Sequence, residues 1–95
     1  MKIKINKDAA NWYKGELKLE DGDYLRFFPR YGGVGGNIPG FSIGINTNEP
    51  IDSKAEVSID GITFYVEKED LWYFEDKDLI IDLDEKLNEP KFSYE

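Results

Sequence analysis

The dipeptide Asp60-Gly61 limits the possible folds of this chain more than any other feature of its sequence. Residues 55–59 before it alternate in polarity, and residues 62–66 after it are rich in β-branched and aromatic side chains. Both patterns are typical of strands. Asp-Gly readily adopts the positive φ angles that both central positions of a type I′ turn require. We therefore expect an antiparallel hairpin over residues 55–66 inside a β-rich domain.

The other predicted elements are short and follow one another closely. Apolar runs or alternating polarity predict strands over residues 2–6, 24–31, 41–46, 79–83 and 92–94. A helix is predicted from Asn6 or Asp8, both good N-caps, to Leu17, and a short helical turn over residues 69–74. Pro29 marks its strand as an edge strand or a bulged one. The expected fold is a single α+β, mostly β, domain over residues 1–95, with one N-terminal helix and a short second helix.

Cysteine and histidine are both absent from the chain. Disulfides, thiolate metal clusters and catalytic relays that use histidine or cysteine are therefore excluded. The serine hydroxyls have no recognisable base in a catalytic motif, and no carboxylate pair stands out among so many acids. We expect a protein that is not an enzyme and that carries no cofactor.

The charge is strongly acidic and unevenly distributed. Twelve Lys and Arg face twenty Asp and Glu, which gives a net charge of −8, and fifteen of the acids lie in residues 49–95. Such a surface repels phosphate backbones and acidic lipid headgroups, so neither nucleic acid nor a membrane is an expected partner. The sequence has no apolar run of membrane-spanning length and no signal-peptide pattern, so the expected location is cytoplasmic.

Residues 32–40 form a glycine-rich loop, which is the best candidate site in the sequence. Tight turns alone explain many such loops, and binding of a ligand or partner is the alternative. Arg26 and Arg30 lie on one face of the preceding strand, where they form either an anion clamp or ordinary surface ion pairs. The candidate binding residues are Arg26, Arg30, Gly32, Gly33, Val34, Gly35, Gly36 and Asn37.

Two pairs of adjacent aromatic residues occur, Trp12-Tyr13 and Trp72-Tyr73. Neighbouring side chains on a helix or strand point in different directions, so one member of each pair is expected at the rim of the core. Exposed Trp and Tyr are frequent anchors of protein interfaces. Packing of all four rings in or beside the core is the alternative.

Several short motifs in this order resemble the HesB-like family of A-type iron–sulfur cluster carriers. They are Ala9-Ala10, the loop from Gly32 to Gly36 followed by Gly40-Phe41, Asp60-Gly61-Ile62, residues 71–74, and residues 87–90 before Phe92. The resemblance implies a single HesB-like domain over residues 1–95 with a folded mixed β-sheet that forms a partial barrel. Val34 stands where that family has its first cysteine, so cluster ligation is not implied.

These observations favour a non-catalytic binding or protein-interaction module built on the HesB-like fold. The alternative is an accessory protein of iron–sulfur biogenesis that binds iron weakly through oxygen ligands or at a site shared between subunits. An enzyme is the third possibility. The expected partner is a protein, with the iron–sulfur assembly machinery as the first candidate, and a homo-oligomer is also compatible with the exposed strand edges.

Overall fold

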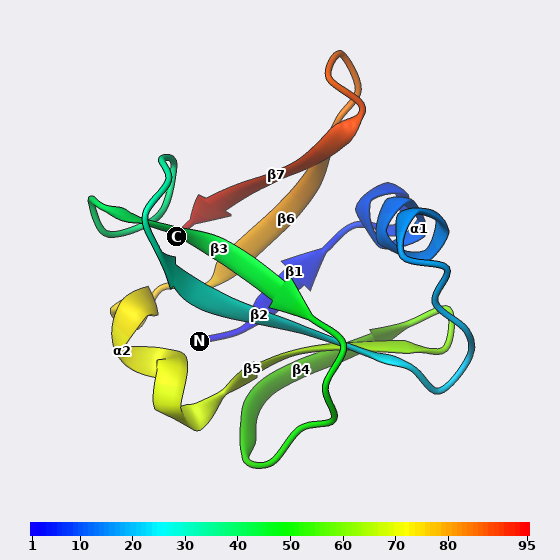
Figure 1. Ribbon diagram of the computed structural model, residues 1–95, viewed down its shortest axis with the longest axis horizontal. Helices are drawn as coiled ribbons and strands as arrows, with labels where there is room; N and C mark the ends of the chain where they lie inside the picture. Colours follow the sequence, from blue (N-terminus) through cyan, green and yellow to red (C-terminus); the bar gives the residue numbers. More distant parts are fainter.

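The computed structural model describes residues 1–95 and consists of seven short strands, two α-helices and one 3-10 helix (Figure 1). The strands are β1 (Ile3–Ile5), β2 (Tyr24–Tyr31), β3 (Phe41–Asn46), β4 (Ser53–Ile59), β5 (Ile62–Glu67), β6 (Leu79–Asp84) and β7 (Glu89–Tyr94). The helices are α1 (Lys7–Glu16), the 3-10 helix η1 (Lys68–Asp70) and α2 (Leu71–Phe74).

The β4–β5 hairpin is confirmed. Asp60 and Gly61 both have positive φ angles, 51° and 81°, and Ile59 is paired with Ile62 directly across the turn. The Gly61 carbonyl accepts a hydrogen bond of 2.8 Å from the Gly22 amide, so the hairpin turn is also fixed against the turn that precedes β2.

Helix α1 begins where the sequence predicts. The Asn6 side chain accepts a hydrogen bond of 2.8 Å from the Ala9 amide, which is the bond of an N-cap. Ala9, Ala10 and Tyr13 are buried and lie on the face toward β6 and β7. Neither α1 nor α2 has the length and the apolar character that a membrane-spanning helix requires.

The strands form two mixed sheets, in the orders β1-β6-β7 and β3-β2-β5-β4. β1 is parallel to β6 and β2 is parallel to β5, and the other pairs are antiparallel. Figure 1 shows the β6–β7 hairpin above the four-stranded sheet, with α1 at the right of the view and α2 at the left. A continuous core of apolar residues joins the two sheets. The mixed, mostly β fold is thus confirmed, but the sheets do not close into a barrel, because their end strands are not paired across the gaps.

The remaining elements differ from the predictions in their lengths. Strand β7 begins at Glu89 and not at residue 92 as predicted. The prediction missed its first half, Glu89-Pro90-Lys91, because these residues are polar and include a proline. Strand β1 is shorter than residues 2–6. β5 pairs with β2 only from Tyr24 to Arg26. The prediction that Pro29 marks an edge or bulged strand was wrong, because β2 lies between β3 and β5 and pairs with β3 without a bulge. Only the end of β2 that carries Pro29 lacks a neighbour on the β5 side.

Two glycine substitutions test how far the hairpin turn controls stability. We expect Gly61→Ala to lower the free energy of unfolding by about 1–2 kcal/mol, because a side chain is strained at this positive φ. Its Cβ would also lie 2.6 Å from the Asp21 carboxylate. Gly15→Ala in α1 meets no neighbouring atom, and we expect it to raise stability by up to about 1 kcal/mol. Urea denaturation of both variants measures this, and equal effects would contradict it.

Candidate functional site

The glycine-rich loop between β2 and β3 is closed at its base and anchored in the middle. At the base, the Gly32 amide donates a hydrogen bond of 2.6 Å to the Gly40 carbonyl. In the middle, a Cβ on Gly36 would overlap the Phe41 carbonyl oxygen and the Tyr73 hydroxyl. Only glycine therefore fits at position 36, where the loop passes against α2.

Asn37 holds the same loop to α2. Its amide donates to the Tyr73 hydroxyl at 2.6 Å, and its side-chain nitrogen donates to the Tyr73 carbonyl at 2.8 Å and to Glu75 at 2.9 Å. Its side-chain oxygen accepts from Lys77 at 3.0 Å. The polar atoms of Asn37 are thus used within the chain, which gives the residue a structural role.

The two arginines of β2 have different surroundings. Arg26 donates to Asp70 at 2.7 Å and to Glu69 at 3.0 Å, and its guanidinium lies 5.5 Å from the centre of the Phe28 ring. Burial lowers the pKa of Arg26, but the hydrogen bonds and charges of Asp70 and Glu69 more than offset it, so the pKa is above its ordinary value. Arg30 forms no ion pair. The surface ion pairing considered for both arginines is therefore present at Arg26 alone.

A cleft of about 600 Å³ runs between the glycine loop, β3, β7 and α1, and we call it the edge cleft. Its lining residues come from all four of these elements and from the end of β2: Trp12, Tyr13, Arg30, Gly33, Val34, Gly35, Ser42, Ile43, Ile45, Glu89, Pro90 and Phe92. The structure thus brings Arg30, Gly33, Val34 and Gly35 to one hollow surface. Among the other predicted residues, Gly32, Gly36 and Asn37 shape the loop, and Arg26 lies outside the cleft.

Exposed aromatic side chains form a second surface feature beside the loop. Tyr31 is 87% exposed and Trp72 is 55% exposed, and each ring lies 5.7 Å from that of Phe41. We call Tyr31, Phe41 and Trp72 the aromatic patch.

Tyr73 is fully buried beside the exposed Trp72, and Tyr13 is buried beside the half-buried Trp12, which confirms the prediction for the adjacent aromatic pairs. Sequence reasoning missed Tyr31, because the strand pattern gave no sign that its side chain would be exposed.

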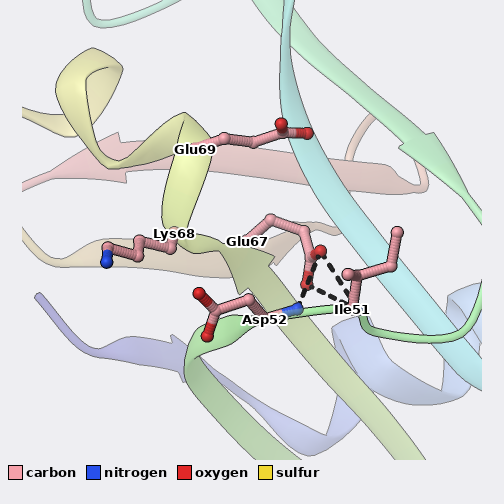
Figure 2. Close-up of a pocket in the computed structure, with 5 residues that line it drawn as sticks. All are labelled: Ile51, Asp52, Glu67, Lys68 and Glu69. Atoms are coloured by element: carbon pink, nitrogen blue, oxygen red, sulfur yellow. Dashed lines mark hydrogen bonds between the residues drawn. The ribbon is translucent and has the colours of Figure 1, made fainter.

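A separate cavity of about 420 Å³ lies between η1 and the connector before β4 (Figure 2). The Glu67 carboxylate, in a buried residue, accepts hydrogen bonds from the amides of Ile51 and Asp52 at 3.1 and 3.2 Å. Figure 2 shows both amides directed at this carboxylate, with Lys68 pointing away from it. Because the carboxylate already accepts hydrogen bonds from two backbone amides, Glu67 has a structural role. It holds the connector between β3 and β4 in place. No three potential metal ligands lie together anywhere in the structure.

The comparisons with known proteins give the family. The chain is 47% identical, over 95 residues and the full length of both proteins, to the "Pyruvate dehydrogenase inhibitor" of Bacillus subtilis. It is 36% identical to an uncharacterised protein of Staphylococcus saprophyticus and 35% identical to one of Staphylococcus aureus, over 98% of each protein. The chain belongs to this family. No family model matches the chain, and no solved structure does.

These relatives correct the resemblance to HesB-like iron–sulfur carriers. The Bacillus subtilis relative is named as an inhibitor of pyruvate dehydrogenase, and nothing in the comparisons points to iron–sulfur assembly. The motifs behind the resemblance are mainly turn residues. Asp60-Gly61 forms a hairpin turn and several loop glycines have positive φ angles, which many unrelated β folds require. The iron–sulfur function and the assembly machinery as partner were therefore wrong.

The two arginines of β2 form a matched pair for a stability test. We expect Arg26→Leu to cost about 1–3 kcal/mol, because it leaves the buried Asp70 carboxylate without its charged partner. Arg30→Leu removes no ion pair, and we expect the free energy of unfolding to change by less than about 0.5 kcal/mol. Chemical denaturation of both variants measures the difference. Similar losses at the two positions would show that the ion pair with Asp70 adds nothing specific.

Proposed function

We propose that this chain is a non-catalytic regulator that binds pyruvate dehydrogenase and inhibits it. The observation that carries the proposal is the 47% identity, over the whole of both chains, to the Bacillus subtilis protein named as an inhibitor of that enzyme. The cytoplasmic location expected from the sequence belongs to the same proposal.

The surface of the molecule supports binding to another protein. Trp, Tyr and Arg are the side chains that most often dominate the energy of protein interfaces. Exposed examples of all three, Trp72, Tyr31 and Arg30, lie on or beside the aromatic patch and the edge cleft. Large exposed rings held against Phe41 are partly ordered before binding, so less side-chain freedom is lost when a partner covers them.

A titration of pyruvate dehydrogenase with the purified chain tests the proposal. At enzyme concentrations well above the dissociation constant, we expect activity to fall in proportion to added chain and to level off at a fixed molar ratio. Removal of the chain by affinity capture should restore activity, because binding forms no covalent bond. No inhibition at any ratio would end the proposal. Progressive, time-dependent loss with catalytic amounts of chain would show that the chain acts as an enzyme.

The aromatic patch gives a second prediction for the same assay. We expect the double variant Tyr31→Ala/Trp72→Ala to weaken binding to pyruvate dehydrogenase at least about tenfold, as loss of interface anchors does. Ile51→Ala is the control, since Ile51 is an apolar side chain that is 94% exposed on the separate cavity. Equal affinity of the double variant and the control, measured by surface plasmon resonance, would place the interface elsewhere.

A further inference from the structure

The free edge of β3 presents unpaired backbone groups. β3 is the end strand of its sheet and pairs only with β2. In an antiparallel pair, hydrogen-bonded and non-hydrogen-bonded residue pairs alternate. The hydrogen bond from Gly32 to Gly40 continues the β2–β3 register, in which Tyr31 faces Phe41. By alternation, Ile43 and Ile45 are in non-hydrogen-bonded pairs, so their backbone N–H and C=O groups point away from β2.

The position of Pro29 agrees with this alternation. Pro29 faces Ile43 across the pair, and proline has no N–H to donate. A proline at a hydrogen-bonded position would have broken the ladder between β2 and β3. At this non-hydrogen-bonded position the proline removes no hydrogen bond between β2 and β3. The free donors of β3 remain on the outer edge.

The edge cleft follows this free edge. Successive side chains of a strand point to opposite faces, and residues from both faces of β3 line the cleft, Ser42 on one and Ile43 and Ile45 on the other. The hollow therefore passes along the edge itself. Its far wall is β7, which pairs only with β6. The cleft thus separates two strands that both lack an outer neighbour.

The two walls are not equivalent as partners for a further strand. The paired hydrogen bonds between Asp78 and Glu95 continue the β6–β7 register. By alternation, the backbone polar groups of Pro90 and Phe92 point away from β6. Pro90 has no N–H, which blocks this edge in the way that prolines protect exposed sheet edges. β3 contains no proline. An added strand would therefore pair with β3.

Polar groups in the cleft indicate the chemistry of the occupant. Arg30 has no ion pair, although the chain has an excess of acids. The Ser42 hydroxyl is buried and has no hydrogen-bond partner. Both residues lie at the loop end of the cleft, while Ile45 and Phe92 add apolar contacts. An extended peptide with a carboxylate near Arg30 and apolar side chains farther along complements this arrangement.

We propose that the edge cleft binds an extended segment of pyruvate dehydrogenase, which adds as a strand to β3 and places a carboxylate against Arg30. This inference rests on the proposed function and names the site through which it operates. The main-chain hydrogen bonds come from Ile43 and Ile45, and the charge of Arg30 fixes the position of the segment along the strand.

Two substitutions at Ile45 distinguish the contribution of its backbone N–H to binding from that of its side chain. Ile45→Pro removes one outward N–H without touching the hydrogen bonds to β2, and Ile45→Thr keeps the N–H and the β-branched shape. We expect Ile45→Pro to bind pyruvate dehydrogenase at least about tenfold more weakly than the unmodified chain, and Ile45→Thr to stay within about threefold. Circular dichroism and thermal unfolding establish that both variants are folded.

Charge variants at Arg30 provide a second, independent readout. We expect Arg30→Glu to weaken binding at least about tenfold and to reduce or reverse the loss of affinity with added salt, because the attraction to the carboxylate becomes a repulsion that salt screens. Arg30→Lys should retain most of the affinity. Equal binding by the Glu and Lys variants would show that no carboxylate lies against this position. These variants keep the proposal testable if Ile45→Pro fails to fold.

The outcomes distinguish this inference from the function on which it rests. If the unmodified chain does not bind pyruvate dehydrogenase, both are overturned. If it binds and inhibits, but Ile45→Pro and Arg30→Glu do so equally well, only the cleft is overturned. If light scattering shows that Ile45→Pro converts a dimer to a monomer with unchanged affinity for the enzyme, the edge of β3 binds a second copy of the chain, and the inference is wrong.

Discussion

The packing of Phe27 holds the two sheets in their relative positions, and the other features of the molecule depend on it. This buried ring lies 5.8 Å from Tyr13 of α1, 6.1 Å from Phe64 of β5 and 6.1 Å from Phe92 of β7. It therefore joins both sheets and the main helix in one aromatic cluster. Rings of this size fill the space between the two sheets. Phe92 belongs both to this cluster and to the lining of the edge cleft, so the core and the cleft share a wall.

Helix α2 connects this core to the binding surface, although it is only one turn long. Tyr73 is fully buried and bonds to Asn37 of the loop through its hydroxyl and its carbonyl, while Trp72 beside it is exposed in the aromatic patch. Just before α2, Asp70 pairs with Arg26 of β2. The loop, the strand and the helix are thus fixed to each other by directed polar contacts. The surface they form is largely ordered without a partner, which favours recognition by a rigid patch.

Features that depend on neighbouring residues could be predicted from the sequence, and features that depend on distant contacts could not. The turn at Asp60-Gly61 and the cap at Asn6 were predictable because their hydrogen bonds or φ angles involve residues within three positions. The pairing of Arg26 with Asp70 and the bonds of Glu67 to the connector join residues far apart in the chain. The family resemblance failed for a related reason, since turn motifs report local backbone geometry and carry little information about ancestry.

Pro90 has a further consequence for what the molecule does when it meets copies of itself. An open strand edge is normally a template on which one chain after another can stack into a fibre. Here a strand added to β3 would lie against the wall that carries Pro90, where a ladder of hydrogen bonds cannot continue without interruption. Growth of the sheet is therefore limited on the β3 side. There, one added strand can pair with β3 without offering a free outer edge on which further strands would stack.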